Sequence, residues 1–415
     1  MIVIGVIVGL LALMLLVTAH EYGHFIMARK NGVEVEEFGI GFMPRAVAWR
    51  KVGGKWRRLK RSEWKKPPGK GLIISLNWLP IGGFCQMKGE SDAAEEKGSF
   101  GQATFWRKTK ILFGGVLANW IVAWIVLSAL AFIGMPHFLD NQFMIEGATD
   151  IVATKPATIK EVVSGSPADE ALLREGDVLT QMRTLGCAFE QECEDDNGGE
   201  RAEIYLVEDV TKFTKAHKGE TVYVSYERNG RMATSEVTLD AESEDYILGA
   251  SLTGDAVYMS SWWSAPIVGL GTTLQVTGET FKGIGELVVN FVGGIVKQVN
   301  FNADVRKDGA EELKEAGEAV SGPVGIVGVL FPAFTESGIH NLLFLVAVIS
   351  ISLACMNVLP IPALDGGRWL LIVIWRLRRK KLDKETEEKI VGRAFLAILI
   401  LAVVVTILDV MRLMR

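Results

Sequence analysis

Residues 2–24 read IVIGVIVGLLALMLLVTAHEYGH, and this stretch decides the architecture of the chain. The run before residue 20 carries no charge and has about the length that a helix needs to cross a bilayer. His20 and His24 are four residues apart, so on a helix they lie on one face and can bind one metal ion. Glu21 projects near that face, where a carboxylate can accept a proton from water. Ionisable groups are costly inside a bilayer, which favours a functional role for this motif.

Two other interpretations of this stretch stay open. The HExxH spacing occurs by chance in unrelated helices, and Val17-Thr18-Ala19 is similar to a signal-peptide cleavage site. No Lys or Arg precedes the apolar run, however, so the positive segment typical of a signal peptide is missing. We therefore expect a membrane helix that carries part of a metal site.

A catalytic zinc site needs a third protein ligand, and the best candidate lies far downstream. Asp365 belongs to the stretch NVLPIPALDGGR at 357–368, which follows a long apolar run. Pro360 and Pro362 cannot continue a helix, and Gly366-Gly367 permits close approach of the backbone. Taken alone, an Asp-Gly pair in this place favours an ordinary turn at the membrane surface.

Topology connects the two motifs. The pattern of apolar runs predicts four membrane spans, at about 2–26, 111–133, 341–360 and 394–411. Lys and Arg are concentrated after the first and third spans, whereas the stretch 134–340 is rich in Asp and Glu. The positive-inside rule then places 134–340 outside and makes the first and third spans run inward. His20, His24 and Asp365 are therefore expected at one depth, near the inner surface.

With these motifs in place, the chain resembles the site-2 proteases, a family of intramembrane zinc metalloproteases. Two motifs carry the resemblance: HExxH at 20–24 in the first span, and NxxPxPxLDG at 357–366 at the end of the third span. Within the family, the chain most resembles the branch of the regulator-of-sigma-E protease. Three shorter stretches are similar to other parts of the family: LPIGGF at 79–84 to a re-entrant strand, GGVLAN at 114–119 to the second span, and SGPVGI at 321–326 to the approach to the third.

The resemblance implies a role for each matching residue. His20, His24 and Asp365 would bind Zn²⁺, and Glu21 would be the general base. Asn357 would hold the substrate or the developing oxyanion near the metal.

A strand edge for the substrate is implied at Gly82, Gly83 and Phe84. A peptide that is unwound for cleavage needs partners for its backbone groups in a dry setting, and addition to an exposed strand supplies them. A simple turn at Gly82-Gly83 is the equal alternative.

Residues 150–255 predict a small β-rich domain outside the membrane. IKEVVSGSPA at 159–168 and GDVL at 176–179 resemble a PDZ domain, and TVYVSYERNG at 221–230 predicts a strand that enters a hairpin turn. One such domain is expected, whereas some relatives carry two. It would capture substrate ends or exclude bulky ectodomains. Cys187 and Cys193 are expected to form a disulfide in this oxidising compartment, with two free thiols as the alternative.

The predicted fold is therefore an α-helical polytopic membrane protein with about four transmembrane helices, a membrane-re-entrant β segment and one extracytoplasmic β-rich PDZ-like domain. The expected parts are an N-terminal membrane part at 1–135, the PDZ-like domain at 150–255, interfacial helices and a connecting segment at 256–340, and a C-terminal membrane part at 341–415.

The expected function is zinc-dependent cleavage of single-pass membrane proteins in the bacterial cytoplasmic membrane. The resemblance implies substrates already shortened by another protease, such as anti-sigma factors or signal-peptide remnants. The chain is 49% hydrophobic and has a formal net charge of −5, and no phosphate loop or basic-aromatic stripe for nucleic acid is found in it. Two alternatives stay open: a non-catalytic scaffold that recruits partners through the PDZ-like domain, and a membrane-anchored zincin that cuts soluble proteins.

Overall fold

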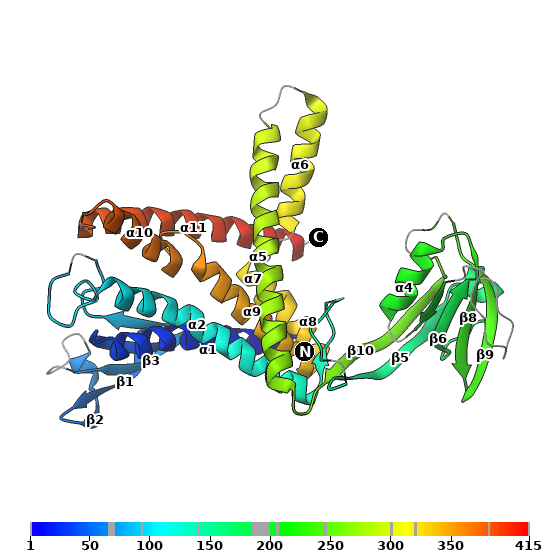
Figure 1. The fold of residues 1–415 in the computed structure, drawn as a ribbon, viewed down its shortest axis with the longest axis horizontal. Helices are drawn as coiled ribbons and strands as arrows, with labels where there is room; N and C mark the ends of the chain where they lie inside the picture. The colour runs from blue at the N-terminus through cyan, green and yellow to red at the C-terminus, as the bar shows by residue number, and fades with distance from the viewer. Residues whose placement is uncertain are drawn as a thin grey trace. The chain divides into compact units, whose positions relative to one another are not determined.

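The computed structural model describes most of the chain, namely residues 2–64, 71–92, 94–139, 141–145, 147–184, 200–204, 207–241, 243, 247–298, 302–318, 322–380 and 382–413. They divide into two compact units. Unit 1 comprises Met1–Ala131 and Ser264–Arg415, and unit 2 comprises Phe132–Trp263. Unit 1 contains the long apolar helices, and unit 2 contains the larger sheet (Figure 1).

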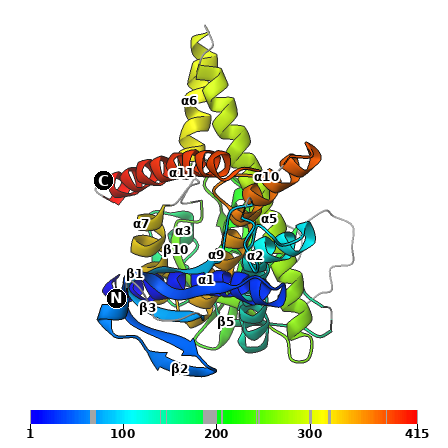
Figure 2. The same cartoon turned by 90° about the vertical axis from the view of Figure 1, so that its left-hand side faces the viewer.

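Unit 1 is mainly helical (Figure 2). In chain order its helices are α1 (Ile2–Lys30), α2 (Phe105–Ile133, whose last two residues belong to unit 2), α5 (Ala265–Gln298), α6 (Ala303–Glu318), α7 (Pro323–Gly325), the π-helical segment η2 (Ile326–Leu330), α8 (Phe331–Glu336), α9 (Ile339–Val358), α10 (Asp365–Leu377) and α11 (Lys384–Leu413). Among the described helices, α1, α2, α9 and α11 are long and apolar enough to cross a membrane. The prediction of a membrane protein with about four spans is thus confirmed as far as helix length and composition can show it.

Helix α1 continues past the histidine motif to Lys30 and ends there because of a glycine. Gly32 has φ +82°, and the N–H of Val33 donates to the carbonyl of Ala28 at 2.9 Å. This is the pattern of a helix terminated by a left-handed glycine, with Arg29 and Lys30 in the favourable last turn. The chain can therefore turn back as a strand beside the helix that it has just left.

The strands of unit 1 form a three-stranded antiparallel sheet in the order β2-β1-β3. Its elements are β1 (Val35–Val52), β2 (Lys55–Arg58), the 3₁₀ turn η1 (Arg61–Glu63) and β3 (Ile73–Met87). Gly39 pairs with Phe84 and Ile40 with Gly83, so the GGF stretch lies inside β3. The alternative of a simple turn at Gly82-Gly83 is therefore wrong. Strand β3 is an edge of the described sheet and lies along α1.

The small residues of α1 serve helix packing, as their spacing predicts. A Cβ on Gly5 would lie 2.8 Å from the nitrogen of Pro332, and one on Gly9 would lie 2.8 Å from the Phe331 ring. Both neighbours belong to α8, which therefore packs directly on the backbone of α1. Helix α6 packs along α5, and together they form the hairpin seen in Figures 1 and 2.

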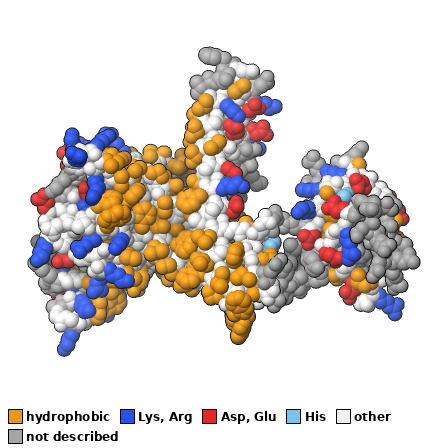
Figure 3. Space-filling view, viewed as in Figure 1, with side chains coloured by type: hydrophobic (Ala, Val, Ile, Leu, Met, Phe, Trp, Pro, Cys, Tyr) orange, Lys and Arg blue, Asp and Glu red, His pale blue; other side chains and the backbone are white. Residues whose placement is uncertain are grey.

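Hydrophobic side chains cover the outside of the helices in unit 1 (Figure 3). They include Leu11 and Leu15 of α1, Ile125 of α2, and Phe395 and Ile400 of α11, all of which are exposed. An exposed apolar surface of this extent is typical of a protein surface that contacts lipid. Lys and Arg side chains gather beyond it at the end that carries β1 and β2.

The described strands of unit 2 form a seven-stranded sheet in the order β4-β10-β5-β6-β8-β9, with β7 paired to β6. Its elements are β4 (Met135–Pro136), β5 (Asp150–Val162), α3 (Pro167–Glu170), β6 (Val178–Thr184), β7 (Arg201–Glu203), α4 (Val207–Ala216), β8 (Thr221–Arg228), β9 (Arg231–Thr238) and β10 (Ala250–Ser260). Positive φ at Asn229 and Gly230 forms the β8–β9 hairpin turn predicted from the sequence. The segment is β-rich as expected, whereas its likeness to a PDZ domain stays a prediction.

Candidate metal centre

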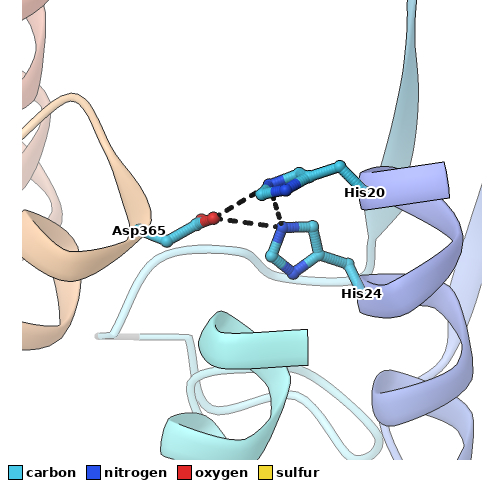
Figure 4. Close-up of side chains that lie close together, drawn as sticks. All are labelled: His20, His24 and Asp365. Atoms are coloured by element: carbon cyan, nitrogen blue, oxygen red, sulfur yellow. Dashed lines mark hydrogen bonds and ion pairs between the residues drawn. The ribbon is translucent and has the colours of Figure 1, made fainter. Parts of the chain in front are cut away.

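Three side chains from distant parts of unit 1 meet at one point (Figure 4). The Nε2 of His20 lies 3.0 Å from the Oδ2 of Asp365 and 3.1 Å from the Nε2 of His24. The third distance, from His24 Nε2 to Asp365 Oδ2, is 3.3 Å. Both imidazoles are buried, and the aspartate is half-buried. Within the described ranges this is the one cluster of three His, Cys, Asp or Glu ligand atoms.

Asp365 reaches the histidines because the connection from α9 to α10 folds tightly on itself. Helix α9 ends at Val358, and α10 begins at Asp365. A Cβ on Gly366 would overlap the carbonyl of Val358, and one on Gly367 would overlap the carbonyl of Ile361. The two glycines thus permit the close backbone approach expected from the sequence, and they place Asp365 at the first turn of α10.

The donor set fits a zinc ion. A tetrahedral zinc with bonds of about 2.0–2.1 Å places its ligand atoms about 3.3 Å apart, and the three distances here are 3.0, 3.1 and 3.3 Å. Two imidazoles and one carboxylate also leave a fourth tetrahedral position for water or substrate. Burial works to raise the pKa of Asp365, but hydrogen bonds with His20 and His24 outweigh it and hold this pKa below its usual range. The carboxyl is therefore in the ionised form that binds metal.

Glu21 lies beside the cluster and next to the neighbouring sheet. The backbone of Cys85 in β3 is near its carboxylate. Glu21, His20, His24 and Asp365 line the same cleft, which has a volume of about 610 Å³. A carboxylate beside the metal position and open to the cleft has the placement of a general base.

Two of the four residues expected to bind substrate line this cleft, and Gly82 and Gly83 are not among its lining residues. Phe84 and Asn357 are among its lining residues. The Nδ2 of Asn357 donates to the carbonyl of Leu353 at 2.9 Å. Gly82 and Gly83 lie in the same strand as Phe84, against Val17 and Thr18 of α1.

Helix α2 forms one wall of the site, which the sequence did not predict. The Nδ1 of His24 lies 2.8 Å from the carbonyl oxygen of Ile111, and the Nδ1 of His20 lies 3.5 Å from the side-chain amide of Asn119. Between them, a Cβ on Gly115 would lie 2.5 Å from His20 Nε2. The available signal was the polar Asn119 within an apolar span, four residues after a glycine.

The cysteines near the site are packing residues. Cys85 and Cys355 are buried and free, and neither belongs to the metal cluster. Burial, and then the charge of Glu21, raises the pKa of the Cys85 thiol to about 12, so it stays protonated. Cys187 and Cys193, with the disulfide predicted between them, lie outside the described residues.

Comparison with known proteins agrees with this geometry. The family profile described as Peptidase family M50 matches residues 8–59 and 64–402, a span that includes all four residues of the cluster and its base. The chain belongs to peptidase family M50. The predictions of a site-2 protease and of a metallopeptidase are confirmed by this match.

The M50 peptidase is similar to several bacterial proteins over nearly their whole length. It is 28% identical over 406 residues to a Clostridium perfringens protein and 26% identical over 410 residues to one from Clostridium acetobutylicum, and the names of both assign them provisionally as zinc metalloproteases. These matches cover 98% of this chain and 98% and 97% of the relatives. Zinc metalloprotease RasP of Shouchella clausii is 23% identical over 483 residues, with 96% of each chain covered.

Proposed function

We propose that this M50 peptidase is a zinc-dependent endopeptidase that cuts the membrane-spanning segments of single-pass proteins. In this proposal His20, His24 and Asp365 bind the zinc ion, and Glu21 is the general base. The observation that carries it is the meeting of three ligand atoms within 3.3 Å of one another, at the end of a helix that can cross a membrane. The names of the relatives support zinc as the metal.

The chemistry follows from the placement of these residues. When bound, zinc supplies the Lewis acidity that lets water ionise near neutral pH and that polarises a carbonyl. Glu21 accepts the proton of the attacking water and passes it to the leaving amine of the substrate. Glu21 and Cys85 line the same cleft, so the nearby backbone N–H of Cys85 would orient the carboxylate during this transfer. An amide NH₂ carries two protons, so Asn357 can donate one to Leu353 and the other to the developing oxyanion.

Strand β3 suits an extended substrate. It is the edge of its sheet among the described strands, and Phe84 and Cys85 of this strand line the cleft beside Glu21. A membrane-spanning helix shields its peptide bonds, so its backbone needs new hydrogen-bond partners when it unwinds. Addition to β3 at Gly82, Gly83 and Phe84 supplies these partners.

The proposed location is the bacterial cytoplasmic membrane, with the metal centre near the cytoplasmic face and unit 2 outside. The concentration of Lys and Arg after α1 and after α9 supports this orientation. Proposed substrates are single-pass proteins shortened beforehand by another protease, such as anti-sigma factors or signal-peptide remnants. Within unit 2, the PDZ-like segment would bind their new ends or exclude long ectodomains.

The test combines metal quantification with cleavage in vesicles. The purified wild-type protein is expected to contain one zinc ion per chain and to cut a shortened single-pass substrate inside its span, as located by mass spectrometry. His20→Ala, His24→Ala and Asp365→Ala are expected to lose the metal and the activity. Undiminished zinc affinity in the Asp365 variant would refute the ligand set.

The same assay separates the two alternative functions. A scaffold would contain no stoichiometric zinc and would tolerate substitution of Glu21. A membrane-anchored zincin would cut a soluble unfolded protein and leave the membrane-spanning substrate intact.

A further inference from the structure

One face of α2 lies against both imidazoles of the metal centre. Ile111, Gly115 and Asn119 follow one another at intervals of four residues, so they share one face of the helix. All three are buried. The two outer residues contact the ring nitrogens that point away from the metal position, and Gly115 leaves the space between them.

The contact to His24 fixes the tautomer of that ring. Its Nδ1 lies 2.8 Å from the carbonyl oxygen of Ile111. A carbonyl oxygen only accepts hydrogen bonds, so Nδ1 must carry the proton. In the neutral imidazole, the form that binds metal, the lone pair is then on Nε2, which is the atom that faces His20 and Asp365.

His20 needs the same tautomer and therefore the same kind of partner. Its Nε2 faces Asp365 at 3.0 Å, so a metal bound there leaves the proton on Nδ1. The partner of Nδ1 among the described residues is the side chain of Asn119, which is 0% exposed. Nδ2 of that amide lies 3.5 Å from the ring nitrogen, and its Oδ1 is buried with no hydrogen-bond partner among the described residues.

We propose that Asn119 is a positioning residue whose Oδ1 accepts the Nδ1 proton of His20 once the metal is bound. Rotation of the Asn119 amide by a half-turn exchanges the positions of Oδ1 and Nδ2. The unpaired Oδ1 then accepts from Nδ1–H of His20, and the amide N–H group no longer faces that N–H group. The ring of His20 is thereby held with its lone pair toward Asp365. The inference rests on the proposed function, because it takes His20 as a zinc ligand.

The hydrogen bonds of Asn119 permit a clean test. Its backbone carbonyl accepts from the hydroxyl of Ser350 at 2.8 Å, a contact between α2 and α9 that involves no side-chain atom of Asn119. Substitution of the amide therefore leaves this helix contact in place. Asn341 of α9 offers a matched control, since it is also buried and also has an unpaired Oδ1.

The experiment measures zinc affinity by chelator competition on the purified full chain, without reference to activity. Asn119→Ala is expected to weaken zinc binding by about 10–100-fold, the usual effect of losing an outer hydrogen bond to a ligating histidine. Asn119→Asp has the same shape and keeps an acceptor, so it is expected to restore binding to within a few-fold of wild type. Asn341→Ala is expected to bind zinc as the wild type does. In ¹⁵N-histidine spectra, the His20 Nδ1 signal should shift in the alanine variant alone.

Any other result would contradict either the proposed role of Asn119 or the proposed function on which it rests. Wild-type affinity in Asn119→Ala, or equal weakening in the alanine and aspartate variants, would show that the amide accepts no proton from His20. Equal weakening in Asn341→Ala would show a general effect of losing a buried amide. If the wild type itself binds no zinc, or if His20→Ala binds it unchanged, the proposed function fails first.

Discussion

Gly115 of α2 faces His20 of α1 so closely that a Cβ on Gly115 would lie 2.5 Å from the Nε2 of the imidazole. The same Cβ would lie 2.6 Å from the Nε2 of His24. These are the two nitrogens assigned to the metal, so the absence of a side chain at residue 115 keeps the metal position open. Adding a single methyl group at residue 115 is therefore a direct test of the proposed metal position.

Gly115→Ala is therefore expected to reduce zinc affinity by at least 10-fold and cleavage in proportion, because one imidazole must turn away from the cluster. Chelator competition measures the affinity. The control is Gly278→Ala on α5, where a Cβ meets nothing within 4 Å. Full zinc affinity in the Gly115 variant would contradict the placement of the metal between the two rings.

Glu21→Gln is expected to keep the metal and abolish cleavage. The amide occupies the space of the carboxylate but cannot accept a proton, and Glu21 does not belong to the cluster of ligand atoms. Zinc content and turnover of a shortened single-pass substrate are measured on the same preparation. Proteolysis at the wild-type rate by the zinc-loaded variant would rule out Glu21 as the base.

Asp409 is expected to hold α11 to the segment before α9. Its carboxylate is buried, and Oδ2 accepts a hydrogen bond from the backbone N–H of Gly325 at 2.8 Å. Asp409→Ala should lower the free energy of unfolding by about 1–3 kcal/mol, because this N–H loses its partner in an apolar setting. Denaturant titration in detergent measures the change. Asp409→Asn keeps an acceptor and should recover most of the loss, and an unchanged alanine variant would show that water replaces the carboxylate.

Removal of 150–255 is expected to change which substrates are cut if unit 2 excludes bulky ectodomains. Two substrates that share one membrane span and differ in ectodomain length are compared before and after the deletion. The filter predicts that the long substrate becomes cleavable, and the Glu21→Gln form of the shortened protein is the control for other proteases. Cleavage of the short substrate alone, in both proteins, would contradict a filter.

The sequence predicted those features that depend on local spacing. The uncharged run before His20 predicts a membrane helix, and the four-residue interval to His24 places both rings on one face of it. Asn229-Gly230 predicts the hairpin between β8 and β9, because both residues tolerate positive φ. Equal depth in the membrane brought the two motifs together, and the family resemblance then implied Asp365 as a partner for His20, 345 positions away.

The contacts between different helices could not be predicted from local spacing in the sequence, and only the tertiary structure decided them. Gly82-Gly83 read equally well as a turn or a strand, and the pairing of Gly83 with Ile40 and of Phe84 with Gly39 made this stretch part of β3. Asn119 carried no assigned role until the crossing of α1 and α2 placed its amide beside His20. The physical reason is that periodicity fixes which side of a helix a residue occupies, whereas the rotation and crossing of two helices depend on the summed packing of many side chains.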